Sequence, residues 1–432
     1  MKKLFVARQY NLFEKFAYPF FEISEDYRII DTVLEDEQII IQLAEDFPDV
    51  ATGRNRTPVE QTLRFLVLKH QKALSYRDLE QTLQENLADR WFCKVTENSP
   101  CFKTLQNQLT RITDETIHRV NDFVMLQARE RKLTKGKRMR VDSTVTEANI
   151  HYPTDATLLA DGIRVLVRVV KQCRKSVPRG FRTFARKVKR EIRIIRTIGR
   201  RSDALRTEAL NRLVAMGEHV VKKVRTIRTH VVVAQKKVLQ QIIVQTKKVM
   251  NGEKIKDRIV SIFELSARAL PKGKPGKLCE FGSEVQVQED ERFITHWQIN
   301  QKHSDTIFFP QALAKHQALY DKPPAEVTTD RGYWSRENQQ IAQKEGVRHI
   351  SLAKKGKAND QEQVHQKTRK FKQLQRWRAG GEAKISWLKR SFKLDRCRYQ
   401  GVHGMALWVG AGILACNVMT FARVIMALKR VT

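Results

Sequence analysis

Two aspartates stand at the ends of predicted strands, where their side chains could hold a divalent cation. Asp142 follows the alternating segment Arg-Met-Arg-Val, and Asp330 follows Glu-Val-Thr-Thr. In open α/β sheets, functional sites collect at strand ends. An aspartate that ends a strand is also a common turn residue, so neither position is decisive by itself. Gly332, two residues after Asp330, would let the backbone turn sharply away from such a site.

A site for two Mg²⁺ ions about 3.5–4 Å apart needs a bridging aspartate and further ligands, and Glu382 is the candidate third carboxylate. On one continuous helix, Arg378 lies four residues before Glu382 and Lys389 seven after it, so the three share a face. That face offers a metal ligand flanked by two cations, which suits a groove where metals meet phosphate. The alternative is a surface ion pair between Arg378 and Glu382. Glu147 is interpreted as a polar neighbour of Asp142.

The charge balance indicates a polyanionic partner. The chain of 432 residues has 81 Lys and Arg against 47 Asp and Glu, a formal net charge of +34. Nucleic acid compensates such an excess through counterion release, and an anionic membrane surface is the other possibility. The six cysteines lack zinc-ligand spacing, and the first residues lack the apolar run of a secretory signal. A reduced, cytoplasmic protein is expected.

Helical patterns dominate the first part of the chain, and the length predicts two or three domains. Residues 1–134 are expected to form a helical N-terminal domain that binds DNA. Thr57 is the expected N-cap of a helix with Pro58 at its first position. Ser75 and Asp78 form a capping-box pattern at the next helix. Two short helices with a tight link resemble a helix-turn-helix unit, although many helical hairpins bind nothing.

The stretch 157–256 predicts a basic helical insertion. Lys and Arg far outnumber Asp and Glu between residues 161 and 250, and β-branched apolar residues recur at helical spacing. A break at 198–203 predicts two long helices folded into an antiparallel hairpin. Its charge favours a DNA-backbone surface over a face that only keeps the protein dissolved.

Strand signals return after residue 257 and predict an α/β catalytic domain made of residues 135–156 and 257–432. Strands are expected at 257–265, 280–288, 292–300, 326–330 and 347–352. A Pro/Gly/Lys loop at 271–277 and a turn at 289–291 separate the first three. Helices are expected at 305–320, 335–345 and within 360–430. The apolar run 404–422 is long enough for a membrane span, but a buried helix packed on a sheet is favoured.

The acidic segments resemble those of DDE transposases from bacterial insertion sequences. Arg378, Glu382 and Lys389 match the spacing of the family's YREK signature, while Gln375 stands where the signature has Tyr. The segment Asp-Arg-Gly-Tyr-Trp from Asp330 matches the family's Asp-x-Gly-x-aromatic pattern. Residues 53–111 resemble the family's N-terminal domain, and residues 388–417 resemble its C-terminal run. The resemblance therefore covers most of the chain outside the basic insertion.

This resemblance implies a ribonuclease H-like catalytic domain interrupted by the insertion. Asp142, Asp330 and Glu382 would bind two Mg²⁺ or Mn²⁺ ions and direct in-line phosphoryl transfers that cut and join DNA. The partners would be double-stranded DNA, as terminal inverted repeats and target DNA, and a second copy of the chain in a homodimer. The protein would act in the bacterial cytoplasm at the nucleoid, without a membrane.

The resemblance also implies residues that contact DNA. Arg378 and Lys389 would hold backbone phosphates, and Lys354 and Lys355 would add phosphate contacts. Trp334 would stack on an unpaired base, or else belong to the core. Two other functions stay open: a catalytically inactive, transposase-derived DNA-binding protein, and a basic protein anchored in a membrane by residues 404–422.

Overall fold

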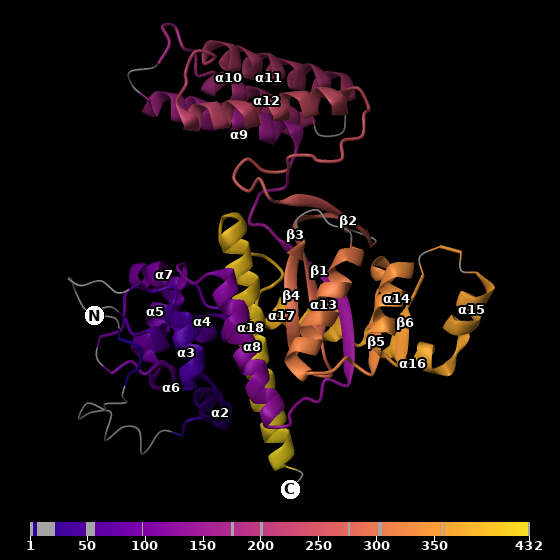
Figure 1. Ribbon diagram of the computed structural model, residues 1–432. Coiled ribbons are helices and arrows are strands. Elements are labelled where there is room, and N and C mark those ends of the chain that lie inside the picture. Colours follow the sequence, from indigo (N-terminus) through magenta and orange to yellow (C-terminus); the bar gives the residue numbers. More distant parts are fainter. Residues whose placement is uncertain are drawn as a thin grey trace. The chain divides into compact units, whose positions relative to one another are not determined.

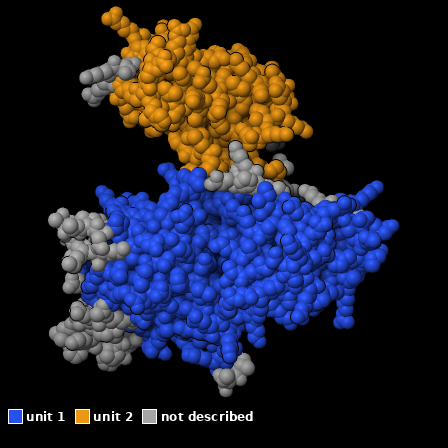
Figure 2. All heavy atoms as spheres, in the orientation of Figure 1, with its two compact units in different colours: residues 1–147, 283–432 blue, residues 148–282 orange. Residues whose placement is uncertain are grey.

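The computed structural model describes residues 3–6, 22–48, 57–96, 98–173, 177–198, 202–274, 277–300, 305–354, 356–357 and 359–430. The chain divides into two compact units, coloured separately in Figure 2. Unit 1 comprises residues 1–147 and 283–432, and unit 2 comprises residues 148–282. The predicted insertion 157–256 lies inside unit 2, and the predicted N-terminal domain lies inside unit 1.

Unit 1 begins with a group of helices: α2 (Glu25–Leu34), α3 (Glu37–Ala44), α4 (Val59–Gln71), α5 (Tyr76–Glu85), α6 (Leu87–Phe92), α7 (Phe102–Leu109) and α8 (Asp114–Glu130). The predicted capping box at the start of α5 is confirmed, because Ser75 and Asp78 bond to each other's backbone N–H. The predicted cap of α4 is wrong by one residue. Pro58 itself is the N-cap, and no side chain bonds there.

A mixed sheet follows, formed by β1 (Arg138–Glu147), β2 (Arg268–Lys274), β3 (Lys277–Glu289), β4 (Ile294–Asn300), β5 (Glu326–Thr329) and β6 (His349–Leu352). Its order is β2-β3-β1-β5-β6, with β4 also paired to β3. β1, β5 and β6 are parallel, whereas β3 and β4 are antiparallel. The chain is thus a mixed α/β protein that is mostly helical.

The predicted strand at 257–265 is wrong. The Gln245 side chain bonds the backbone of Ile259 in both directions, each over 3.0 Å, and Ser261 caps the following turn at Phe263 and Glu264. These bonds satisfy the backbone locally, so the segment has no need of a strand partner. The strand instead forms in the Pro/Gly/Lys segment, where β2 pairs with β3. The later strands, β3 to β6, are confirmed.

Helices cover both faces of the sheet within unit 1. Met139 and Val141 of β1 pack with Phe308 and Phe309 of α13 (Asp305–Tyr320), in a core that also includes Ala342 of α14 (Arg336–Lys344). The opposite face meets α16 (Arg369–Ala379) on β5 and β6, and α17 (Gly381–Ser391) on β1. Helix α15 (Asp360–Lys367) precedes them. Side chains alternate along a strand, so Arg140 and Asp142 point toward α16 and α17.

The apolar C-terminal run is a buried helix, α18 (Gly401–Lys429), which lies along α8 in Figure 1. It is the one helix in the described part of the chain that is long and apolar enough to cross a membrane, and 67% of its most apolar window is buried. Its neighbours are α2, α4 and α8 more than the sheet. Close approach needs glycine, because a Cβ at Gly410 would lie 2.7 Å from Cγ2 of Ile117.

The described part of unit 2 contains four helices around an apolar core, so the predicted two-helix hairpin is wrong. The helices are α9 (Asp155–Gln172), α10 (Ala185–Ile198), α11 (Asp203–Lys223) and α12 (His230–Met250). Gly180 with φ +67° lies in the first unforeseen break, and Val224 ends α11 at the second. At the predicted break, Ser202 caps α11, while residues 199–201 lie outside the described residues.

Candidate metal and DNA site

The two aspartates lie side by side at the edge where β5 ends. β1 and β5 pair in register from Arg138 with Glu326 to Val141 with Thr329. Asp142 and Asp330 are the next residues on the two strands, so their side chains leave on the face opposite Val141. The prediction that Asp330 follows a strand is confirmed. Asp142 lies within β1 rather than at its end, because β1 continues to Glu147, which bridges to Arg396.

A guanidinium group lies between these carboxylates. Nη1 of Arg378 is 3.7 Å from Oδ2 of Asp142 and 4.0 Å from Oδ1 of Asp330. The Asp142 side chain is 18% exposed and that of Asp330 is 54% exposed. Burial raises the pKa of the Asp142 carboxyl, the Ser143 N–H and Arg378 lower it, and Asp330 and Glu382 raise it. Arg378 therefore supplies the positive charge that the paired carboxylates require.

Glu382 approaches the same place from a separate helix. α16 ends at Ala379 and α17 begins at Gly381, so the prediction of one helix carrying Arg378 and Glu382 is wrong. The alternative ion pair between them is also absent in the described residues, where Arg378 pairs with the aspartates instead. Glu382 is exposed in the first turn of α17. Its carboxylate is close enough to raise the pKa of Asp142.

Arg140 fixes the junction between α16 and α17 against the sheet. Its guanidinium lies 2.6 Å from Oε2 of buried Glu289 and donates to the Trp377 carbonyl oxygen over 2.9 Å. The same group lies 5.0 Å from the Trp377 ring centroid. A Cβ at Gly381 would come within 3.2 Å of Arg140 Nε, so glycine permits this approach. Arg140 thereby helps to position the start of α17, and with it Glu382, relative to Asp142.

The donor set fits a hard divalent cation in its chemistry. Mg²⁺ and Mn²⁺ prefer carboxylate and water oxygens, and Asp142, Asp330 and Glu382 offer carboxylates. As they stand, no three His, Cys, Asp or Glu side chains in the described ranges are close enough to hold one ion. The guanidinium of Arg378 lies where a cation would meet both aspartates.

Two family models match the chain. One, a transposase domain (DUF772), covers residues 17–111, and the other, a transposase DDE domain, covers residues 337–422. The chain belongs to the DDE transposases. The second match includes Arg378, Glu382 and Lys389, whereas Asp142 and Asp330 precede it. Comparisons with curated proteins and with solved structures gave no match.

The aromatic and lysine positions expected to contact DNA are partly engaged within the transposase itself. Trp334 follows the 3-10 turn η3 (Arg331–Tyr333) and packs against the core beside β1 and β5. The Lys354 ammonium lies 4.8 Å from its ring centroid and 2.7 Å from Oε2 of Glu362. Lys389 lies half-buried in the last turn of α17. Lys355 lies outside the described residues. These DNA contacts stay predictions.

Gln375 occupies the signature position where the family has Tyr. Its amide donates to the Ser351 carbonyl oxygen over 2.9 Å and to Thr328 Oγ1 over 3.2 Å. These bonds join α16 to β5 and β6, so in this transposase the residue holds the helix that carries Arg378 on the sheet.

Sequence reasoning missed a second acidic group behind the aspartates. A Cβ at Gly332 would lie 2.5 Å from Oδ2 of Asp305, so this glycine makes room for a carboxylate. The backbone turn expected there does not require glycine, since the φ angle of Gly332 is not positive. The buried Tyr333 hydroxyl lies near the same carboxylates. Burial raises its pKa well above the usual value, and Asp305, Asp142 and Glu284 raise it further.

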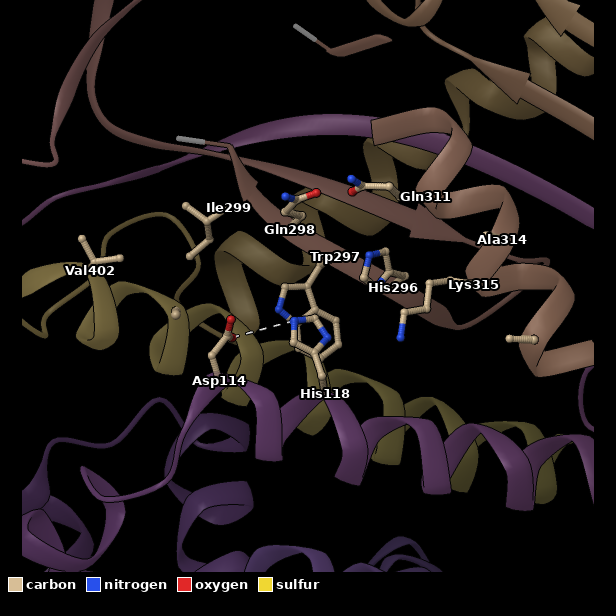
Figure 3. A pocket seen from close by; sticks show the side chains of 12 residues that line it. Asp114, His118, His296, Trp297, Gln298, Ile299, Gln311, Ala314, Lys315 and Val402 are labelled. Atoms are coloured by element: carbon tan, nitrogen blue, oxygen red, sulfur yellow. Dashed lines mark ion pairs between the residues drawn. The ribbon is translucent and has the colours of Figure 1, made fainter. Parts of the chain in front are cut away.

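A cavity of about 840 Å³ lies elsewhere in unit 1, between α8, β4, α13 and α18, and contains none of the three acids (Figure 3). His118 stacks on Trp297 with centroids 3.9 Å apart, and its Nε2 lies 3.8 Å from Asp114. Burial lowers the pKa of His118 to about 4 and that of His296 to about 3. Both imidazoles are neutral near pH 7, and Asp114 is the one acid among the residues that line this cavity, so it lacks a cluster of carboxylates.

Proposed function

We propose that this transposase cuts and joins DNA by in-line phosphoryl transfer at Asp142, Asp330 and Glu382, within a ribonuclease H-like domain. The supporting observation is that Asp142 and Asp330 lie next to each other on the paired strands β1 and β5 and both contact Arg378. The Glu382 carboxylate is near enough to raise the pKa of Asp142. Two Mg²⁺ or Mn²⁺ ions, when bound, would stabilise the attacking and leaving oxygens.

In this proposal, Arg378 exchanges its carboxylate partners for a DNA phosphate. Its contacts to the aspartates are long, at 3.7 and 4.0 Å, and its buried Nε has no hydrogen-bond partner among the described residues. A phosphate offers a guanidinium two acceptor oxygens at once. Once the Arg378 guanidinium has moved to the phosphate, Asp142 and Asp330 would be free to accept cations. Arg140 would keep α17 and Glu382 in place.

Unit 2 is proposed as a DNA-backbone surface. Exposed cations recur on one face of α10 at helical spacing: Arg186, Lys189, Arg193 and Arg196. Each neutralised phosphate releases counterions and adds to affinity. The helices before residue 134 are proposed as the N-terminal DNA-binding domain.

We propose terminal inverted repeats and target DNA as the substrates of a homodimer in the bacterial cytoplasm, at the nucleoid. Two transposon ends must be joined in one complex, which is the reason to expect two copies of the chain.

The test is nicking of supercoiled plasmid with Mg²⁺. Asp142→Asn and Asp330→Asn should each abolish nicking and strand transfer while DNA binding stays largely intact, because the amide removes a metal ligand and little else. Asp360→Asn, an exposed change in the first turn of α15, is the matched control and should nick normally. Equal loss of DNA binding in the two aspartate variants would count against a metal-ligand role.

A transposase-derived DNA-binding protein that no longer cuts is the alternative. The observation that favours it is the spacing of the acids, since no three in the described part of the chain converge within metal-holding distance. Plasmid that stays supercoiled with wild-type protein and either cation, despite DNA binding, would support this alternative.

A further inference from the structure

A second cationic site lies beside α17, where Arg140 and Gly380 also form part of the lining. A cavity of about 400 Å³ is bordered by α17, the end of α18 and the turn between β3 and β4. Lys384 and Trp387 come from α17, Arg423 comes from α18, and Arg292 comes from the turn. None of these residues has a part in the reaction proposed above.

The cations of this site gather around one indole ring. The Lys384 ammonium lies 5.0 Å from the Trp387 ring centroid, and the Arg423 guanidinium lies 4.5 Å from it. Lys384 also donates to the Arg292 carbonyl oxygen over 2.8 Å. These contacts hold the positive charges of α17 and α18 together around one ring, where like charges repel unless an anion joins them.

The cations that line the cavity outnumber the acids, since Arg140, Arg292, Lys384 and Arg423 stand against Glu289 and Glu291. Glu289 is bound by Arg140, with 2.6 Å between the charged atoms, and the nearby Lys384 ammonium also lowers the pKa of Glu289. Glu291 also lines the cavity, but the described residues contain no ion pair between a carboxylate and Lys384, Arg423 or Arg292. The site therefore keeps a net positive charge in a shallow hollow, where clustered cations attract an anion together.

We propose that Lys384, Arg423 and Arg292 bind a backbone phosphate of the DNA strand that is cut at Glu382. This assignment rests on the proposed function, and it adds a second anchor for the same strand. The guanidinium of Arg423 can meet two phosphate oxygens, and Lys384 adds a point charge. Trp387 keeps the two side chains in the cavity and so lowers the entropy cost of binding.

The helix geometry gives the distance between the anchor and the cut. Residues two apart on a helix face about 200° apart, so Lys384 and Glu382 lie on nearly opposite sides of α17. An α-helix is about 10 Å across, and each DNA strand carries one phosphate per about 3.4 Å of axis. The phosphate in the cavity should therefore be about three nucleotides from the cleaved bond.

The first experiment measures binding of a 30-base-pair duplex by fluorescence anisotropy, without divalent cations, across a salt series. The slope of log affinity against log salt changes by about 0.9 for each phosphate that the protein no longer neutralises. Lys384→Gln with Arg423→Gln should lower the slope by one to two and weaken binding about tenfold at roughly 0.1 M salt. Lys344→Gln, an exposed cation on α14, is the control and should change the slope by less than half as much.

The second experiment locates the phosphate on the DNA. Single methylphosphonate groups replace phosphates one at a time along one strand of the duplex. At one position, or two adjacent positions, the loss of affinity seen with wild-type protein should disappear in the Lys384/Arg423 variant. Arg423→Gln alone repeats the test with a change at an exposed side chain, in case the double variant unfolds.

The outcomes separate this inference from the function on which it rests. If the wild-type protein fails to bind the duplex, the proposed function itself is wrong. If the wild-type protein binds but the Arg423 and Lys384 variants match Lys344→Gln in slope, the phosphate site is wrong and the acid site is untouched. Additive losses at every methylphosphonate position would also overturn it.

Discussion

Replacing Arg140 by methionine tests whether this guanidinium holds α16 and α17 against the sheet. Arg140 lies within the sheet core, where it bonds Glu289 by both Nε and Nη2 and the Trp377 carbonyl oxygen by Nη1. Methionine has a similar length but no charge and no donor. The change therefore leaves the Glu289 side chain, only 7% exposed, without its ion-pair partner, while Lys384 still lowers its pKa from nearby.

The expected loss of stability follows from that stranded charge. Removing one partner of a buried ion pair costs about 3–5 kcal/mol, and removing the bond to Trp377 adds about 1 kcal/mol. Removing Glu289 as well should restore most of this, because apolar replacement of a whole buried pair is often close to neutral. We expect Arg140→Met to destabilise unit 1 by roughly 3 kcal/mol or more, and Arg140→Met/Glu289→Met by about 1–2 kcal/mol.

Amide hydrogen exchange in β1, β3 and α17 measures the loss of stability near Arg140. A local measurement is needed because a protein with two units does not unfold in one step. Protection in these elements should fall in Arg140→Met and recover in the double variant. Glu289→Met alone should resemble the first change, since it strands the opposite charge. Equal protection in the single and double variants would refute the argument that the pair is buried and coupled.

Three further changes test other parts of the molecule. Burial lowers the pKa of His118 from 6.5 to about 4, so the folded state binds fewer protons there than the unfolded state. Its contribution is complete above about pH 6.5 and is lost as the pH falls through 4, about 3 kcal/mol in all; His118→Phe should remove that part of the pH dependence of urea unfolding, and an unchanged profile would contradict it. Gly412→Ala should destabilise α18 by about 1–3 kcal/mol, because the new Cβ overlaps Leu394; thermal unfolding at the wild-type temperature would show that the helix can shift. Changing Arg186 and Arg193 on α10 to Gln should lower the salt slope of duplex binding by about two, and a slope equal to wild type would remove α10 from the DNA surface.

The positions of the two aspartates could be predicted from local patterns, since short alternating strands end or pair just before them. The family signature indicated Glu382, although the pattern did not reveal that Gly380 divides the helix between Arg378 and Glu382. Helical spacing in the basic insertion was visible, but its β-branched repeat does not specify how many times the chain turns back. The loop that contains Gly180 and the turn after α11 at Val224 supplied the two extra breaks.

The contacts that position the site could not be predicted, because they join residues far apart in the chain. In the sequence, Arg140 is an ordinary basic residue of a strand. Its role depends on Glu289 and the Trp377 carbonyl, which only the folded chain brings next to it. Gly332 suggested a turn, and its actual neighbour Asp305 belongs to a different helix. The strand predicted at 257–265 failed for the same reason, since the side chain of Gln245 competes for its backbone.

The insertion leaves and re-enters the sheet at one place. Ala148, just after β1, donates its N–H to the carbonyl oxygen of Phe281 on β3 over 2.9 Å. The helical part between these neighbours, from α9 to α12, can lengthen, shrink or be exchanged without altering the pairing of β2, β3, β1, β5 and β6. A whole helical module can therefore be gained or lost at this junction while the sheet that carries Asp142 and Asp330 stays the same, so the length of a homologue between these two points says little about that sheet.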